Sequence, residues 1–104
     1  MKKYDKLVRD KIIKIIEKDG KKADYELVEG EEFEKYLVKK LQEEVNEFKE
    51  EGEIEEIADI LEVIEALLSV NDLDWEDVFE LKERKAKKRG KFDKGIILKK
   101  VWEG

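Results

Sequence analysis

Hydrophobic residues recur with helical spacing along most of this 104-residue chain. That spacing, with the glycines and polar turns that end it, predicts four helices: one before Gly20, one from Glu31 to Gly52, one from about Glu53 to Val70, and one ending before Gly90. Asp74, followed by Asp77, is typical of an N-cap with a nearby acid and opens the last helix. The pattern therefore predicts a mainly α protein.

Two short segments favour strands instead. Residues 23–28, with the sequence ADYELV, alternate between apolar and polar side chains, and the tail near residues 96–101 is strand-like and suited to pair with them. Only a tight turn at Gly52 separates the two long helices, so an antiparallel helical pair is expected at the centre of the fold. No linker or repeat interrupts the chain, and residues 1–104 are expected to form a single domain.

Some acids of the second long helix fall among its apolar positions. At about 100° per residue, with Ile54 at zero, the apolar side chains span roughly 160° to 340°. Glu56 falls at about 200°, inside this arc, and Asp59 at about 140°, at its edge. The other acids of this helix form a solvated stripe: Glu55, Glu62 and Glu65.

The first long helix carries a similar pair of acids. With Phe33 at zero, Glu44 lies at about 20°, within an apolar arc that reaches Val45 at about 120°, and Glu47 flanks the arc at about 320°. Each long helix thus supplies two acids with i, i+3 spacing, and the turn at Gly52 would bring the helices side by side. We therefore predict a site of four carboxylates: Glu44, Glu47, Glu56 and Asp59.

Four ionised carboxylates in a partly dry space repel one another, and burial and like charge would both raise their pKa values until some protonated. A divalent cation removes this conflict. The chain has no Cys and no His, so oxygen must bind any metal, which selects Mg²⁺, Mn²⁺ or Ca²⁺ over zinc or copper. Alternatively, acids at an apolar edge pack only their aliphatic stems, but two such pairs on adjacent helices favour metal.

Composition narrows the class of protein. Half of the residues are charged, but Leu, Ile, Val and Phe make up 32 of 104, above the roughly 20% expected of disordered chains, so the chain should fold. Abundant Lys and Glu is typical of heat-adapted proteins. No apolar run is long enough for a membrane span or a signal peptide, so a cytoplasmic protein without a membrane partner is expected.

Four segments of the sequence resemble one protein family. EEVNE at 43–47 and EEIAD at 55–59 are similar to the ExxE and ExxD motifs of the MazG-like all-α nucleoside triphosphate pyrophosphohydrolases. That superfamily also includes phosphoribosyl-ATP pyrophosphohydrolase and dimeric dUTPases. KLVRDKI at 6–12 and KKRGKF at 87–92 resemble one compact MazG-like branch. The resemblance implies an antiparallel helical bundle of the MazG-like all-α type over most of the chain.

The resemblance also implies an activity. Members of this superfamily hydrolyse the bond between the α and β phosphates of a nucleotide, releasing a monophosphate and pyrophosphate. Carried over by motif, Glu44, Glu47, Glu56 and Asp59 match the family's metal ligands, with Mg²⁺ as the expected cofactor and Mn²⁺ as the alternative. A ligand carboxylate such as Glu44, or the neighbouring Glu43, would orient the attacking water. The sequence does not specify the base of the nucleotide substrate.

Basic residues near both ends of the chain are candidates for phosphate contacts. The resemblance assigns this role to Lys85, Lys88 or Arg89, together with Arg9 or Lys11 from the LVRDKI segment. The alternative is that the helix dipole favours a Lys-rich last turn and that these side chains are simply solvated.

Two other classes of function stay open. The wide apolar face of the second long helix would also suit a non-catalytic helical oligomerisation module, and self-association is expected in either case. The resemblance implies a homodimer or homotetramer. Binding of polymeric nucleic acid is disfavoured, because the net charge is −6 and the basic run lacks interleaved aromatic residues. The acids separate the first two classes, since a pure oligomer seam would gain nothing from Glu56 and Asp59 in its apolar arc.

Overall fold

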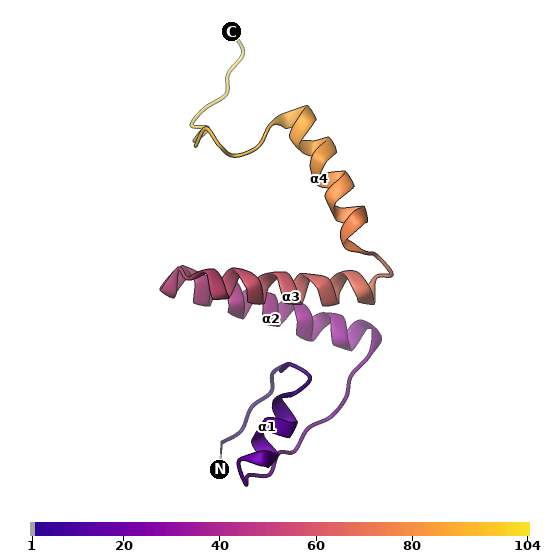
Figure 1. The fold of residues 1–104 in the computed structure, drawn as a ribbon. Coiled ribbons are helices and arrows are strands. Elements are labelled where there is room, and N and C mark those ends of the chain that lie inside the picture. The colour runs from indigo at the N-terminus through magenta and orange to yellow at the C-terminus, as the bar shows by residue number, and fades with distance from the viewer. Residues whose placement is uncertain (1) are drawn as a thin grey trace. The chain divides into compact units, whose positions relative to one another are not determined.

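The computed structural model describes residues 2–104, which contain four helices and no strand. The helices are α1 (Ile12–Lys18), α2 (Gly30–Glu51), α3 (Ile54–Val70) and α4 (Trp75–Arg89) (Figure 1). The predicted mainly α class is therefore confirmed. Helices α1 to α3 belong to one compact unit that ends at Leu73, and Asp74–Gly104 form a second. None of the helices among residues 2–104 combines the length and the apolar character that a membrane crossing requires.

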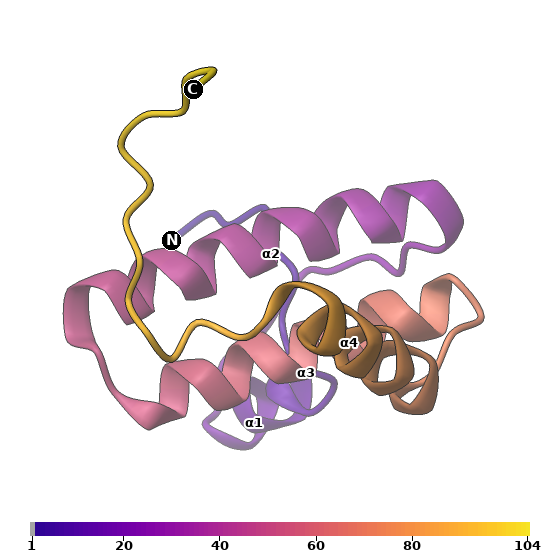
Figure 2. The same ribbon diagram turned by 90° about the horizontal axis from the view of Figure 1, so that it is seen from above.

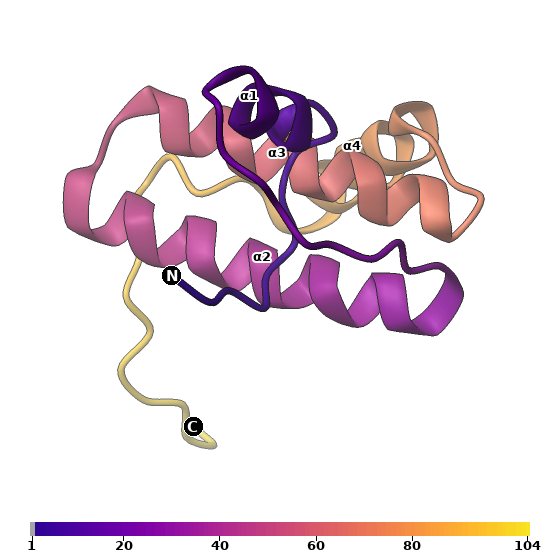
Figure 3. The same ribbon diagram turned by 90° about the horizontal axis from the view of Figure 1, so that it is seen from below.

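Helices α2 and α3 pack against each other and form the centre of the first unit (Figures 2 and 3). At the end of α2, Gly52 has a φ of +65°, in the left-handed region that glycine adopts without a Cβ clash. Its N–H donates to the Phe48 carbonyl at 2.7 Å, which closes the last turn of α2. Glu53 is extended and α3 begins at the next residue. The turn predicted at Gly52 is confirmed.

A second connection between α2 and α3 is made by side chains. Asn71, directly after α3, donates from Nδ2 to Glu34 Oε1 on α2 at 2.9 Å and to the Leu67 carbonyl at 2.8 Å. The same amide thus closes the end of α3 and joins it to the early part of α2. The two helices are fixed to each other at the Gly52 connection and again at Asn71.

Few apolar side chains in the described part of the chain are fully buried. Leu37 on α2 and Val63 and Leu68 on α3 are the buried hydrophobic residues. Other large apolar residues of the same helices stay exposed: Val38, Val45, Phe48, Ile54, Ile57 and Leu61. Two helices cannot cover the whole apolar surface of each other, so the helix pair retains an open apolar stripe.

The segment before α1 contacts both long helices. Arg9 Nη2 donates to Asp59 Oδ1 on α3 at 2.6 Å, and Tyr36 Oη on α2 donates to Asp5 Oδ1 at 2.9 Å. Helix α1 follows this segment and ends shortly before Gly20, as the sequence predicts. Two polar contacts therefore attach the N-terminal segment to the long helices.

The second unit contains α4 and the tail that follows it. Asp74 Oδ1 accepts from the Asp77 N–H at 3.0 Å, and Asp77 Oδ2 accepts from the Asp74 N–H at 3.0 Å. This reciprocal capping box satisfies two N–H groups that the helix itself leaves unpaired, and it confirms the predicted N-cap. Directly after the cap, the rings of Trp75 and Phe79, one turn apart on α4, stack at a centroid distance of 5.6 Å.

The prediction of two strands was wrong. Residues 23–28 and 96–101 adopt no strand pairing. A strand requires a hydrogen-bonded neighbour, and these segments belong to different units. Their apolar side chains also lie in solvent, with Leu27 91% and Leu98 76% exposed. The alternation in the sequence therefore buries no face, which removes the gain that would hold a two-stranded ladder together.

Candidate metal centre

One carboxylate on each long helix is buried. Glu44 of α2 is 6% exposed and Glu56 of α3 is 7% exposed. Each has its Oε2 atom shielded from solvent and without a hydrogen-bond partner among the described residues. Burial removes the hydration of a carboxylate, and an unpaired oxygen leaves that loss uncompensated. The helical spacing predicted both residues to lie on the covered faces.

Glu44 has one cation beside it. Lys40 Nζ lies 3.5 Å from Glu44 Oε1, one helical turn earlier on α2. The pKa of Glu44 is nevertheless raised, because burial disfavours its charged form and the negative charges of Glu47 and Asp59 add to this effect, while Lys40 opposes it. Glu47 and Asp59 therefore both lie close enough to Glu44 to act on its charge.

Asp59 is already paired with a cation from the same chain. Arg9 donates to it at 2.6 Å, with the Arg9 and Asp59 side chains 58% and 39% exposed. An ion pair this open to solvent contributes about 0–1 kcal/mol to stability. The pair thus places a guanidinium beside one predicted metal ligand without contributing much to the fold.

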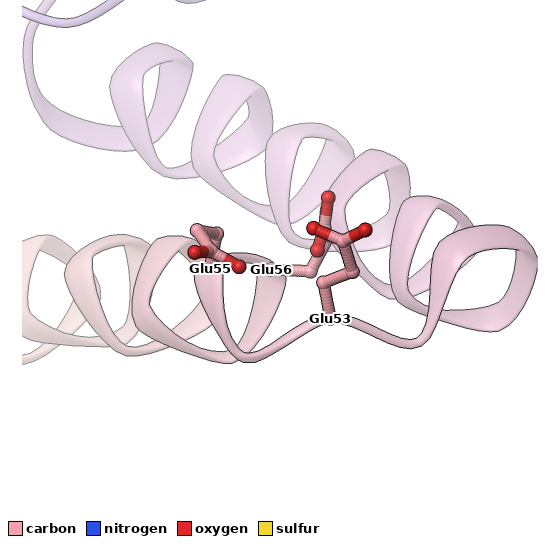
Figure 4. Close-up of side chains that lie close together, drawn as sticks. All are labelled: Glu53, Glu55 and Glu56. Carbon is pink, nitrogen blue, oxygen red and sulfur yellow. The ribbon is translucent and has the colours of Figure 1, made fainter.

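Glu56 lies near a different set of acids. Its closest grouping is with Glu53 and Glu55, where one carboxylate oxygen of each residue lies within 4.8 Å of the others (Figure 4). Glu51, at the end of α2, has a raised pKa because it shares a hydrogen bond with Glu56 and is repelled by its charge. The connection between the long helices therefore concentrates negative charge around a buried carboxylate.

The four predicted ligands do not form one equally tight group in the described residues. The group whose oxygens approach within 4.8 Å is the one at the start of α3, whereas Glu44 interacts with Glu47 and Asp59. Glu44 and Glu56 are buried, Asp59 is half-buried and Glu47 is exposed. Whether all four hold one cation stays a prediction.

Glu43, the candidate for orienting water, lines a groove of about 420 Å³ on α2. Its other walls come from the N-terminal segment and from α2: Asp5, Lys6, Leu7, Tyr36, Lys39, Gln42 and Asn46. Glu43 is half-buried, and it lies next to Glu44 in sequence but about 100° away around the helix. Glu43 therefore borders this groove.

The basic candidates lie in several parts of the chain. Lys11 is exposed directly before α1, and Arg9 is engaged with Asp59. Lys85, Lys88 and Arg89 are exposed on the last two turns of α4, in the second unit. Within the first unit, Arg9 contacts a predicted metal ligand, Asp59.

The residues on the two long helices suit a hard divalent cation. Their donors are carboxylate oxygens alone, which Mg²⁺, Mn²⁺ and Ca²⁺ prefer. Two of these oxygens, on Glu44 and Glu56, are buried without a partner. The protein supplies Lys40 and Arg9 as counter-charges for Glu44 and Asp59, but no ion pair of the described residues reaches Glu56. The donor set therefore fits such an ion, with the need for positive charge greatest at Glu56.

Sequence reasoning missed several members of this site. Lys40 precedes Glu44 by four residues, and that i, i+4 spacing alone would have paired them. Glu51 and Glu53 flank the turn at Gly52, where a short connection necessarily crowds acids together. The pairing of Arg9 with Asp59 spans 50 positions, and no local pattern indicates it.

Comparisons of the chain with models of known protein families, with curated proteins and with solved structures found no match.

Proposed function

We propose that this protein is a Mg²⁺-dependent nucleotide pyrophosphohydrolase, which cleaves the bond between the α and β phosphates of a nucleoside triphosphate or a related nucleotide. The observation that carries the proposal is the burial of Glu44 and Glu56 on two packed helices, each with an unpartnered oxygen. Buried carboxylates stay ionised only beside positive charge. Mg²⁺ bound by a few carboxylates and by substrate phosphates is a common way to supply it.

In this proposal the ligands of Mg²⁺, or of Mn²⁺ in its place, are Glu44, Glu47, Glu56 and Asp59. When bound, the ion polarises phosphate oxygens and lowers the pKa of a coordinated water. The similarity of EEVNE and EEIAD to the ExxE and ExxD motifs supports the same four residues. A chain without His or Cys is adequate for this chemistry, because phosphoryl transfer depends on positioning and charge more than on a protein nucleophile.

Arg9 has two roles in the proposal. In the nucleotide-free protein its guanidinium neutralises Asp59 at 2.6 Å. The same fork of N–H donors matches a phosphate group. When the Asp59 carboxylate binds the cation, the Arg9 guanidinium would leave Asp59 and donate to a phosphate oxygen instead. The exposure of both side chains leaves room for this exchange. Lys40 meanwhile keeps its charge close to Glu44 on the same helix.

The remaining candidates act on the water and the phosphates. Glu43 orients the attacking water, and Lys11 supplies positive charge for the departing pyrophosphate. For Lys85, Lys88 and Arg89 of the second unit, a contact with phosphate is proposed from the resemblance alone. Pyrophosphate carries several negative charges, and the group that leaves is stabilised by cations that reach its oxygens.

The fold proposed with this activity is an antiparallel helical bundle of the MazG-like all-α type, assembled as a homodimer or homotetramer. Support for self-association comes from the apolar stripe on the helix pair, whose members include Val45, Phe48, Ile57 and Leu61. A second copy that packs α2 and α3 against the same stripe would form a bundle and remove it from water.

The same stripe supports a second candidate function, a non-catalytic helical oligomerisation module. Such a module needs the apolar residues and has no use for a buried carboxylate on each helix. Glu44 and Glu56 therefore favour the enzyme over the module.

The proposal is tested by incubating the protein with a panel of nucleoside triphosphates and Mg²⁺ and measuring pyrophosphate. We expect at least one nucleotide to yield pyrophosphate and monophosphate in equal amounts. In a Glu56→Gln, Asp59→Asn variant, release should fall by on the order of 10²-fold or more, because two of the carboxylates that bind the catalytic cation are lost.

The matched control is Glu50→Gln, Glu62→Gln, which removes two acids from exposed positions on the same two helices. It should retain the activity of the intact protein. Pyrophosphate release that survives in the Glu56, Asp59 variant would refute the ligand set. No release from any nucleotide would favour the oligomerisation module.

A further inference from the structure

Three glutamates converge at the start of α3. Glu53, Glu55 and Glu56 lie within four consecutive residues, and one oxygen from each carboxylate lies within 4.8 Å of the other two (Figure 4). Glu53 and Glu55 are exposed, whereas Glu56 is 7% exposed. Three like charges at this spacing repel one another, so the arrangement calls for compensation.

A second observation points to what is missing. Oε2 of Glu56 is shielded from solvent and has no hydrogen-bond partner among residues 2–104. The ion pairs of those residues involve Arg9, Lys21 and Lys40, and none of them reaches Glu53, Glu55 or Glu56. Glu56 is therefore a buried carboxylate that the described chain provides with no cation.

The dipole of α3 accounts for only part of this cluster. Its N-terminus carries roughly +0.5 elementary charge and stabilises acids in the first turn, which explains Glu53 and Glu55 without any ion. Three carboxylates carry three negative charges, several times what the dipole offsets. The dipole also gives no partner to the buried oxygen of Glu56.

The spacing of the oxygens is compatible with a calcium ion. Ca²⁺ binds oxygen at about 2.3–2.6 Å, so two ligands on opposite sides of one ion lie up to about 5 Å apart. Mg²⁺ binds at about 2.0–2.1 Å in strict octahedral geometry, which limits that distance to about 4.2 Å. Three carboxylate oxygens that all lie within 4.8 Å of one another can surround one Ca²⁺ ion, and the exposed Glu53 and Glu55 suit its tolerance of irregular geometry.

We propose that Glu53, Glu55 and Glu56 form a second binding site for a divalent cation, of the Ca²⁺ type, at the connection between α2 and α3, and that this site shares Glu56 with the proposed catalytic ligands. The ion lies against the N-terminal end of α3 and compensates the buried Glu56 carboxylate. The site does not depend on the proposed activity, because it needs no nucleotide. Glu56 borders both sets of acids, whereas Glu53 and Glu55 lie outside the proposed catalytic ligands.

The test is isothermal titration calorimetry of the full chain with CaCl₂ at neutral pH and without nucleotide. We expect Ca²⁺ uptake in which one ion per chain depends on Glu53 and Glu55. The variant Glu53→Gln, Glu55→Gln should bind at least about tenfold more weakly, since ligand changes at metal sites typically cost 10- to 100-fold in affinity. The single variant Glu55→Gln should show a smaller loss, and circular dichroism should report unchanged helicity in both.

Two control variants make the result specific. Glu50→Gln, Glu62→Gln removes the same charge at exposed positions and should bind Ca²⁺ like the intact chain. Glu44→Gln, Glu47→Gln removes proposed catalytic ligands and should keep Ca²⁺ binding while losing pyrophosphate release. The variant Glu53→Gln, Glu55→Gln should instead lose Ca²⁺ binding and keep pyrophosphate release. Failure of this site and failure of the proposed activity therefore give different results.

The inference is overturned if the intact chain takes up no Ca²⁺ at concentrations up to about 10 mM, above the weakest range of protein calcium sites. It is also overturned if Glu53→Gln, Glu55→Gln binds Ca²⁺ as well as the intact chain. Loss of binding in the Glu44, Glu47 variant alone would place the ion between the helices instead and would equally contradict it.

Discussion

Glu44 illustrates how a single residue links packing to chemistry. Its side chain lies on the packed face of α2, where hydration is lost, and Lys40 Nζ lies 3.5 Å from its Oε1 atom. Glu47 and Asp59 add negative charge, so the pKa of Glu44 is raised. A residue in this position costs stability when ionised, which is the usual mark of a group retained for binding or catalysis.

The raised pKa of Glu44 predicts a pH dependence of stability. The pKa of Glu44 is raised above its ordinary value of 4.5, so the folded state holds the Glu44 proton more tightly than the unfolded state does. This contribution to the free energy of unfolding is therefore present at low pH and is lost as the pH rises through the folded-state pKa. Urea unfolding in EDTA should show a shallower decline of stability with rising pH in Glu44→Gln than in the intact protein. An equal or steeper decline in the variant would contradict this account of Glu44.

At the level of elements, the helix pair depends on very few buried contacts. Leu37 is 2% exposed on α2, and Val63 and Leu68 lie opposite on α3. The bounds of α2 and α3 could be predicted from the helical spacing of the apolar residues and from Gly52, which ends α2. The angular positions of the apolar residues also predicted which faces are covered. The strands could not be predicted in this way, because pairing depends on a neighbour that residues 23–28 and 96–101 do not have.

Truncation of Leu37 tests this dependence. Leu37→Ala should lower the free energy of unfolding by about 2–5 kcal/mol, because it removes a buried side chain and leaves a cavity. Val38→Ala, at a neighbouring position that is 52% exposed, should change it by about 0.5 kcal/mol or less. Chemical denaturation followed by circular dichroism measures both. Equal losses in the two variants would show that α2 does not pack through the Leu37 face.

In the candidate site too, features set by local helix geometry could be predicted from the sequence, and contacts between distant residues could not. Burial of Glu44 and Glu56 could be read from the angular position of each residue on its helix, since helical geometry is local. The contact of Arg9 with Asp59 depends on how the N-terminal segment folds back, which no periodicity encodes. The buried carboxylates and the local partner Lys40 were thus predictable, whereas the distant partner Arg9 was not.

For the whole molecule, the exposed apolar stripe on α2 and α3 predicts association. Multi-angle light scattering should give a mass two or four times the 12.4 kDa of one chain. Replacing Ile57 and Leu61 with Asp places charges on the stripe and should yield monomers. Leu27→Asp, at an exposed position outside the helices, should leave the mass unchanged. A monomeric intact protein would contradict the proposed assembly.

The most direct test of the central claim is the Mg²⁺ dependence of pyrophosphate release by the intact protein and by Glu44→Gln. The claim is that a buried carboxylate on α2 helps to bind the metal used in nucleotide hydrolysis. We predict release only when Mg²⁺ is present, a loss on the order of 10²-fold or more in Glu44→Gln, and full activity in the exposed control Glu50→Gln. Release without a divalent metal, or equal release by Glu44→Gln and the intact protein, would contradict it.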